Sequence, residues 1–366
     1  MRILVVSPVT PYLPSHDGAR TMVAHLVRSL APVHSMALVS ATTAADTPEQ
    51  RQWSAGLCGW TRLVSAGRWR HPLSLHPAEG VSRLRDAVLE GVRDFAPDVL
   101  HLEGSELAPL ARVGGRPSVL VVRDSESLSA TGQHRRAHNA WGWIDRLDEW
   151  QQAAWEHAWF ERADVVLTGD EVPIGIDLDH HEFRRTGQPG RIVFTADLAR
   201  PAGGLAAERF ATSIFPQVQA VWSRAELLLT GGDPARSVRA LGALPGVRVT
   251  GVMPDLRPTL WSAAVAVPTT RAGLLEAMAL GTPVVVSSRP AASVSDVVAG
   301  RHALIVDDDD ATAEALLAVI RDADLAERLA YAARTIVEER HGWPVVARRY
   351  DAIWRRLQAA PAGLSA

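Results

Sequence analysis

The sequence VAVPTTRAGLLEAMALGTPVVVSS, which runs from Val265 to Ser288, decides the fold of the protein. Its apolar and β-branched runs alternate with loop residues, so it predicts a strand at Val265–Val267, a loop at Pro268–Gly273, a helix at Leu274–Leu280 and a second strand at Val284–Ser287. Gly281 and Pro283 end the helix, because glycine and proline stop helices efficiently. The order strand, loop, helix, strand is typical of a parallel α/β sheet.

A helix in this position directs its N-terminus to the carboxyl edge of the sheet, where backbone N–H groups and the helix dipole favour an anion. We expect Glu276 in the first turn of this helix. A carboxylate is a poor neighbour for phosphate, but it accepts hydrogen bonds from two adjacent hydroxyls, such as those of a ribose. Phosphate on the amides and ribose on Glu276 would describe a nucleotide. The alternative is an ordinary first-turn glutamate that interacts with the helix dipole.

The segment LLEAMALGTPVV resembles the signature of retaining glycosyltransferases of family 4, bacterial group 1-type enzymes with the GT-B fold. The resemblance implies an α/β protein with two Rossmann-like, doubly wound domains that face each other across a cleft. It also implies a nucleotide-diphosphate sugar as the donor, with Glu276 on its ribose. Transfer with retention of configuration, and no metal or other cofactor, are further implications of the same resemblance.

Composition limits the classes of protein that fit. The length of 366 residues suits about two domains, and 47% apolar residues suffice for sizeable cores. The net charge of −3 argues against nucleic acid as the main partner. No apolar run is long enough for a transmembrane segment, and the N-terminus enters a strand at once instead of a signal peptide. We therefore expect a cytoplasmic protein and leave peripheral membrane contact open.

The chain contains no lysine and a single cysteine, Cys58. The lack of lysine excludes a P-loop lysine, a Schiff-base lysine and a protein-kinase lysine. One cysteine forms no internal disulfide and no zinc cluster, and its Gly/Trp-rich surroundings fit a structural cysteine better than a catalytic thiol. Any phosphate clamp must therefore be an arginine, a backbone amide or a metal.

The first domain is predicted over residues 1–170, from alternating strands and helices. Strands are expected at Arg2–Ser7, Ser35–Ser40, Pro97–Glu103, Ser118–Val122 and Ala163–Thr168, and helices at Thr21–Leu30, Ala78–Phe95 and Trp141–Arg162. The segment Ala41–Pro77 has weak periodicity, and we assign it no chemistry.

Three positions of this domain are candidates for the site. Gly18 precedes the first helix, where it is either a turn glycine or a place for close backbone approach to a ligand. It resembles the family's first loop, whose backbone meets the donor pyrophosphate, although Ala19 replaces a second glycine. The segments PDVLH and VVRDSES resemble two strand ends of the family, with Arg123 in place of its histidine. We propose His101 and Asp124 as candidate proton acceptors; His101 is alternatively a strand histidine satisfied by its neighbours.

The second domain is predicted over residues 171–344, and residues 345–366 form a helix that in this fold crosses back to the first domain. Strands are expected at Arg191–Thr195, Leu227–Thr230, Val247–Thr250 and Ala303–Val306, and helices at Ala311–Ile320, Leu325–Glu338 and Val345–Leu357. Arg200 is a candidate pyrophosphate clamp or a solvated loop arginine. The resemblance adds donor-binding positions at Gly231, Met253, Arg271, Gly273, Leu274 and Leu275.

The leading hypothesis is a hexosyltransferase-like enzyme that acts on a small-molecule or glycan acceptor. A sugar-nucleotide epimerase would share the nucleotide site and need no acceptor. A catalytically silent GT-B subunit that requires a partner is the other alternative. Arg123 and Pro268 motivate it, because Pro268 stands where many family members have a second glutamate.

Overall fold

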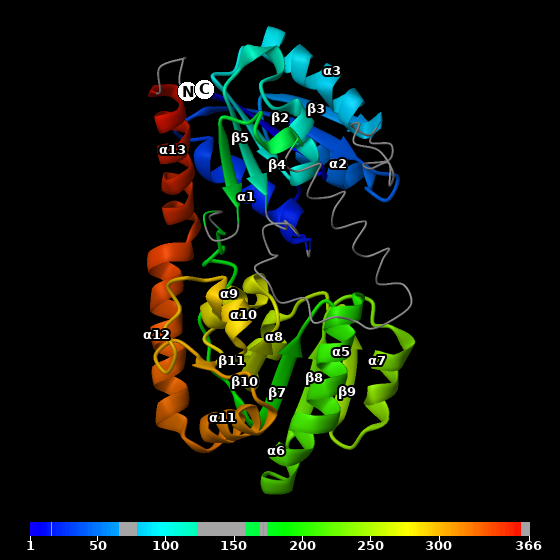
Figure 1. Ribbon diagram of the computed structural model, residues 1–366, viewed down its shortest axis with the longest axis vertical. Coiled ribbons are helices and arrows are strands. Elements are labelled where there is room, and N and C mark those ends of the chain that lie inside the picture. Colours follow the sequence, from blue (N-terminus) through cyan, green and yellow to red (C-terminus); the bar gives the residue numbers. More distant parts are fainter. Residues whose placement is uncertain (16, 66–78, 123–157, 169–170, 172–173, 360–366) are drawn as a thin grey trace. The chain divides into compact units, whose positions relative to one another are not determined.

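The computed structural model describes residues 1–15, 17–65, 79–122, 158–168, 171 and 174–359, which Figure 1 draws in colour. The chain divides into two compact units. Unit 1 comprises Met1–Pro173 and Val346–Ala366, and unit 2 comprises Ile174–Val345. The candidate Asp124 and most of the predicted helix Trp141–Arg162 lie outside the described residues.

Unit 1 is built on a six-stranded parallel sheet with the order β3-β2-β1-β4-β5-β6. Its strands are β1 (Arg2–Ser7), β2 (Ser35–Thr42), β3 (Trp60–Ser65), β4 (Val99–Glu103), β5 (Ser118–Val122) and β6 (Val165–Thr168). This order is that of a doubly wound sheet. Every residue of β4 and β5 is buried, as expected when helices cover both faces of a parallel sheet.

The described residues of unit 1 also form helices, one of which the sequence analysis did not assign. They are α1 (Gly18–Leu30), α2 (Pro48–Ala55), α3 (Glu79–Asp94) and, from the end of the chain, α13 (Trp343–Ala359). The strand β3 and the helix α2 fall in the segment Ala41–Pro77, to which no element was assigned. A capping box begins α2: the Thr47 hydroxyl accepts from the Gln50 amide at 3.3 Å, and the Gln50 side chain accepts from the Thr47 amide at 2.9 Å.

The C-terminal helix α13 packs its aromatic side chains into unit 1. Tyr350 and Trp354 are fully buried, and both rings meet the His101 ring of β4 edge-on at 5.4 Å. His34, which follows α1, contacts Trp354 edge-on at 5.5 Å. The contacting residues are 249 to 320 positions apart in the sequence, so α13 is an integral part of the unit 1 core.

Unit 2 contains a second parallel sheet, with the order β10-β7-β8-β9. Its strands are β7 (Gln188–Thr195), β8 (Glu226–Thr230), β9 (Val247–Gly251) and β10 (Ala263–Pro268). The pair β11 (Val285–Val286) and β12 (Leu304–Ile305) extends the β10 side through a parallel bridge between Ala266 and Val284. Unit 2 is therefore also a doubly wound, Rossmann-like domain.

Helices alternate with these strands along the chain (Figure 1). They are α5 (Pro201–Arg209), α6 (Phe215–Val221), α7 (Arg236–Ala240), α8 (Arg257–Trp261), α9 (Arg271–Leu280), α10 (Ser288–Ala292), α11 (Asp309–Arg321) and α12 (Ala323–His341). The helix α9 is central, because Leu274 and Leu275 have no exposed surface and anchor it in the core.

The C-terminal end of α9 is fixed by a glycine and an arginine. Gly281 adopts the left-handed conformation (φ 83°) that ends a helix, as the sequence predicts. Arg334 of α12 donates to the carbonyl oxygens of Ala279 at 2.7 Å and His181 at 2.6 Å. A cation on the last carbonyls of a helix is favourable, so α9 is held firmly at the end away from its N-terminus.

We expect Trp354→Ala to lower the free energy of unfolding by about 3 to 5 kcal/mol, because it leaves a large cavity under α13. Trp354→Phe, which keeps a six-membered aromatic ring but loses the five-membered ring of the indole with its N–H, should cost less than the alanine variant. Urea denaturation of the two variants beside the wild type measures both values. A loss below about 1 kcal/mol for the alanine variant would contradict the packing of α13 described here.

Candidate functional site

The strands β7 and β10 define a switch point in the sheet of unit 2. They are neighbours, yet β8 and β9 extend the sheet beyond β7, while β11 and β12 extend it beyond β10. In open α/β sheets, ligands bind outside the carboxyl ends of the strands at such a point. β7 ends at Thr195 and β10 at Pro268, so the loops that follow these residues form the candidate site.

Three loops pack backbone on backbone at this carboxyl edge. The Ala196 amide donates to the Thr230 carbonyl at 3.1 Å, and the Gly231 amide donates to the Gly251 carbonyl at 3.3 Å. Gly231 has φ 142°, and a Cβ atom there would lie 1.6 Å from the Ala196 carbonyl oxygen. Only glycine fits this position. Gly231, a predicted donor-binding residue, therefore lets the loops after β7, β8 and β9 meet.

The N-terminus of α9 rests on the end of β7. Thr270 caps the helix, and its hydroxyl accepts from the Gly273 amide at 3.1 Å. The Thr269 hydroxyl donates to the Thr195 carbonyl at 3.0 Å. A Cβ atom on Gly273 would lie 3.0 Å from the Thr195 hydroxyl oxygen, so this glycine permits the close approach of helix and strand. The first turn of α9 thus faces the switch point.

The position of Glu276 corrects one expectation. Because α9 begins at Arg271 and not at Leu274, Glu276 lies in the second turn of the helix. Its side chain is half-buried and has no hydrogen-bond or ion-pair partner within the described part of the chain. Burial raises the pKa of the Glu276 carboxyl to about 7. The helix dipole acts in the opposite direction and would lower this pKa.

The other predicted residues of unit 2 take different places. Leu274 and Leu275 are completely buried, so only their backbone atoms are available to a ligand. Arg200 is the N-cap residue of α5; its side chain is 76% exposed and forms an ion pair with Asp197, with Nε and Oδ2 3.1 Å apart. Arg271 is the first residue of α9, and Met253 lies in the loop after β9.

The loop after β9 is fixed by a network that the sequence analysis missed. The Arg257 guanidinium donates to both carboxylate oxygens of Asp255 at 2.9 Å and to the His180 carbonyl at 2.8 Å. The Thr259 hydroxyl contacts the Met253 sulfur at 3.5 Å. The Arg257 hydrogen bond holds the pKa of Asp255 below its ordinary value. Met253 therefore lies in a loop that these hydrogen bonds hold in place.

In unit 1, Gly18 is the first residue of α1 and not the residue before a helix that starts at Thr21. Asp17 is the N-cap, and its carboxylate accepts from the amides of Ala19 and Arg20 at 2.9 and 3.3 Å. A Cβ atom on Gly18 would meet nothing within 4 Å. Packing within unit 1 therefore does not demand glycine here, and its ligand role stays a prediction.

His101 is buried inside unit 1. The Trp354 indole N–H donates to Nδ1 of His101 at 3.3 Å, so the ring proton must be on Nε2, which donates to Glu103 Oε1 at 2.8 Å. Neither ring nitrogen can then accept a proton from a substrate. This geometry fits the alternative of a strand histidine satisfied by its neighbours.

A partly buried ion pair between Arg20 and Asp46, which the sequence analysis missed, braces the first loop of unit 1. Arg20 donates to Asp46 at 2.6 Å, and the second carboxylate oxygen of Asp46 accepts from the Thr10 hydroxyl and the Thr43 amide, both at 2.7 Å. Burial alone would raise the pKa of Asp46, but these hydrogen bonds hold it below its ordinary value. Burial raises the pKa of the Cys58 thiol to about 12, which disfavours the reactive thiolate.

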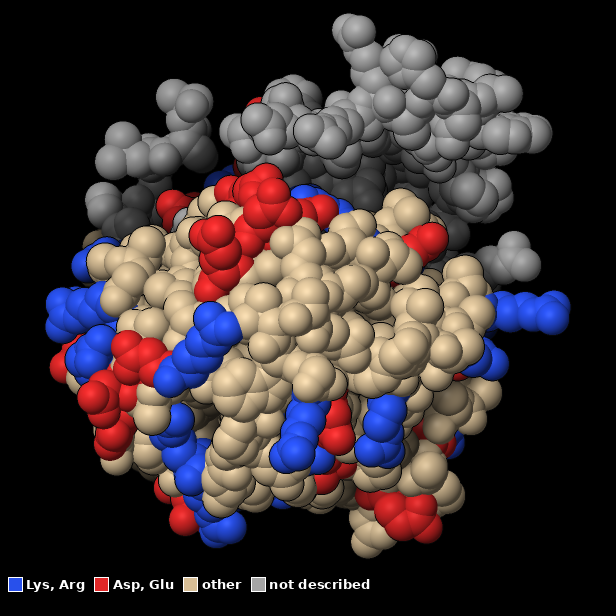
Figure 2. Space-filling model, turned by 90° about the horizontal axis from the view of Figure 1, so that it is seen from below, with Lys and Arg blue, Asp and Glu red and all other residues tan. Residues whose placement is uncertain are grey.

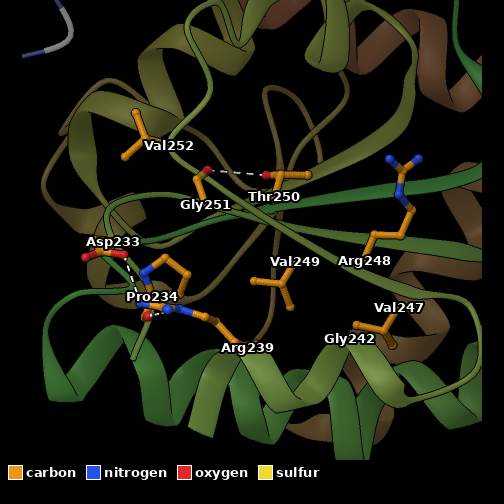
Figure 3. A pocket seen from close by; sticks show the side chains of 10 residues that line it. All are labelled: Asp233, Pro234, Arg239, Gly242, Val247, Arg248, Val249, Thr250, Gly251 and Val252. Carbon is orange, nitrogen blue, oxygen red and sulfur yellow. Dashed lines mark hydrogen bonds and ion pairs between the residues drawn. The ribbon is translucent and has the colours of Figure 1, made fainter. Parts of the chain in front are cut away.

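A groove of about 710 Å³ runs along the outer edge of β9 (Figure 3). Ten residues line it: Asp233, Pro234, Arg239, Gly242, Val247, Arg248, Val249, Thr250, Gly251 and Val252. Because β9 is the last strand of the sheet, this β9 groove lies beside the switch point and not at it. The β9 groove adjoins the candidate site through the loops after β8 and β9. The candidate site itself lies at the switch point, where open α/β sheets bind their ligands.

The charged side chains that Figure 2 shows are mixed in sign. On that face, arginines and carboxylates alternate around a broad uncharged area. Binding of nucleic acid would call for a continuous basic stripe. Each helix in the described ranges is too short or too polar to cross a bilayer.

Comparison with solved structures identifies the fold. Sucrose-phosphate synthase from Thermosynechococcus elongatus has a TM-score of 0.66 at 18% identity, over 98% of this chain and 100% of that chain. HepE from Anabaena, solved with UDP and glucose, has a TM-score of 0.61 at 14% identity, over 98% and 99%. A protein assigned as UDP-N-acetylglucosamine 2-epimerase from Listeria monocytogenes has a TM-score of 0.54 at 13% identity, over 96% and 95%. The chain has the GT-B fold of two Rossmann-like domains, as predicted.

Residues 189–322 match the family described as glycosyl transferases group 1. This stretch runs from β7 into the end of α11 and includes every loop of the candidate site in unit 2. No curated protein sequence matches the chain. Since one fold carries both a synthase and an epimerase, the activity must be argued from the site.

The pKa of Glu276 predicts how stability depends on pH. The folded protein keeps this carboxyl protonated up to about pH 7, whereas it ionises near its ordinary value of 4.5 in the unfolded chain. The wild type should therefore lose stability relative to Glu276→Gln as pH rises from 4.5 to 7, by no more than about 3 kcal/mol. Thermal unfolding at pH 5 and pH 8 measures the difference.

The matched control is Glu314→Gln on the exposed face of α11, for which we expect no such pH-dependent gain. If Glu276→Gln changed stability equally at both pH values, the carboxyl would not be desolvated as described.

Proposed function

We propose that the protein is a glycosyltransferase that moves a sugar from a nucleoside-diphosphate sugar to a small-molecule or glycan acceptor. The observation that carries the proposal is Glu276, half-buried and without a described partner, one turn inside a helix whose N-terminus faces the switch point of unit 2. The family match of residues 189–322 supports it, because it spans this site. A nucleotide whose ribose hydroxyls donate hydrogen bonds to the Glu276 carboxylate would fit these residues.

The spacing along α9 suits a nucleotide. Glu276 lies five residues after the first residue of the helix, which is about 7.5 Å along its axis. A diphosphate at the N-terminus would meet the first-turn amides and the positive end of the dipole. The ribose would then reach the second turn, where its hydroxyls can donate to the carboxylate. The base would extend toward Met253 in the loop that Asp255 and Arg257 hold.

The chemistry follows from charge. As the sugar leaves, negative charge develops on the diphosphate, and preorganised donors lower the barrier by stabilising it. In our proposal these donors are the α9 amides, Arg271 and Arg200, and neither a lysine nor a metal is required. We further propose retention of configuration, a hexosyl donor and a cytoplasmic location, in line with the sequence resemblance.

The first prediction from this proposal concerns donor affinity. Glu276→Ala should raise the dissociation constant for the preferred nucleoside diphosphate by about 10- to 100-fold at pH 8, because two hydroxyls lose a charged acceptor. Isothermal titration calorimetry with UDP, GDP, ADP and TDP measures the change. Glu314→Ala on α11 is the control and should bind like the wild type. Equal affinities for Glu276→Ala and the wild type would remove the basis of the proposal.

Turnover separates the alternatives. Purified protein is incubated with the matching sugar nucleotides, with and without candidate acceptors, and the products are followed by mass spectrometry. A transferase releases nucleoside diphosphate in step with glycosylated acceptor. An epimerase, the class of the Listeria monocytogenes relative in fold, would convert the sugar nucleotide with no acceptor present. Nucleotide binding without turnover, restored by a partner protein, would instead support the silent subunit.

A further inference from the structure

The loop after β7 places a carboxylate where the proposed site needs positive charge. Asp197 follows the strand by two residues, and its Oδ2 pairs with Nε of Arg200 at 3.1 Å. Its Oδ1 accepts from the Ala199 amide at 3.2 Å, which fixes the side chain. A Cβ atom on Gly232 would lie 3.1 Å from the same Oδ1, so the carboxylate also rests against the loop after β8. Asp197 is thus a built part of the carboxyl edge.

This arrangement has two electrostatic consequences for a diphosphate at the switch point. Arg200, at the start of α5, is paired with Asp197 through Nε, so its positive charge is already partly offset when its terminal nitrogens meet phosphate. The carboxylate itself repels phosphate oxygens, and this repulsion grows with the charge of the ligand. Both effects make Asp197 oppose anion binding at a site that otherwise favours it.

Asp197 repels the nucleoside diphosphate product more strongly than the nucleotide-sugar substrate. In a nucleotide sugar both phosphates are esterified, and each carries one negative charge. In the free nucleoside diphosphate the terminal phosphate gains a second charge near pH 7, because its second pKa is about 6. The extra charge lies at the end of the ligand that enters the loop of Asp197 and Arg200.

We propose that Asp197 is a specificity-determining residue that weakens the binding of the nucleoside diphosphate product more than that of the nucleotide-sugar donor. It does so by competing with the terminal phosphate for Arg200 and by repelling its additional charge. The consequence is faster product release and weaker product inhibition. This inference rests on the proposed function and assigns Asp197 a role in product release at the same site.

Two other arginine–aspartate pairs at the carboxyl edge of unit 2 lie farther from the switch point than the pair of Asp197 and Arg200. Asp233 pairs with Arg239 at 3.1 Å after β8, and its side chain is 87% exposed. Asp255 and Arg257 follow β9 and hold its loop. Of these three pairs in the described part of unit 2, Asp197 and Arg200 alone follow a strand that borders the switch point.

Asp197→Asn tests the proposal, because asparagine keeps the shape and still accepts from the Ala199 amide but loses the charge. We expect the variant to bind the nucleoside diphosphate about tenfold more tightly and the nucleotide sugar only about threefold more tightly. Calorimetry at pH 7.5 gives both constants, and the shift in their ratio should shrink at high salt. Asp197→Ser, which also accepts from the amide, repeats the test if the asparagine variant is poorly folded.

Two controls make the outcome decisive. Glu226→Gln removes one charge from a comparable pair, with Arg191 at 3.2 Å, at the opposite edge of the same sheet, and should leave both constants unchanged. Arg200→Ala should weaken both ligands. If nucleotides bind but the ratio of constants is the same in Asp197→Asn and the wild type, the assignment of Asp197 is wrong and the proposed function stands. If the wild type binds no nucleotide, the proposed function itself is wrong.

Discussion

At the carboxyl edge of unit 2, the Ala196 carbonyl oxygen lies so close to Gly231 that this position has no room for a Cβ atom. The loop after β7 passes so near the loop after β8 that any side chain at Gly231 would collide with the Ala196 carbonyl. Gly231 in turn donates to Gly251, which brings in the loop after β9. The three loops are therefore one rigid backbone surface, and the groups that they carry have defined places. Asp197, Arg200 and Met253 lie on these loops, and local hydrogen bonds and an ion pair hold them there.

The helix α9, which packs against these loops, contains residues that stabilise unit 2 and one residue, Glu276, that destabilises it. Its C-terminus is held by Gly281 and Arg334, and its flank by fully buried leucines, which contribute the apolar burial that stabilises the unit. By contrast Glu276 is a half-buried carboxyl whose pKa burial raises and which has no partner among the described residues. Groups that cost stability in the free protein concentrate at functional sites. A ligand that donates hydrogen bonds to Glu276 would satisfy this carboxyl. The free energy that the free protein loses there would then favour binding of the ligand.

Sequence patterns predicted the alternation of strands and helices because both sheets are parallel and buried, which makes each strand a short apolar run between turn residues. The start of α9 was wrong by three residues, since Gly273 suggested a loop while Thr270 acts as the cap. The helix α2 carried a readable signal in Thr47, Pro48 and Gln50 that weak apolar periodicity obscured.

Other parts of the site depend on contacts that no local pattern reveals. His101 has the residue type and strand position of a catalytic base, but Trp354, 253 residues away, occupies its Nδ1. The pairing of Asp197 with Arg200 likewise follows from the loop conformation. The roles proposed for Gly18, Arg271 and Met253 are still predictions, because they concern a ligand. Asp124 lies outside the described residues.

The central claim is that a nucleoside diphosphate binds on the joined loops and the first turns of α9. Hydrogen exchange followed by mass spectrometry, on the whole protein with and without the nucleoside diphosphate that binds best, tests it most directly. Bound nucleotide should slow exchange in segments 196–200, 231–234, 251–256 and 269–276 and leave the rest of unit 2 unchanged. Protection confined to segment 239–249, along the β9 groove, would place the ligand elsewhere and contradict the account.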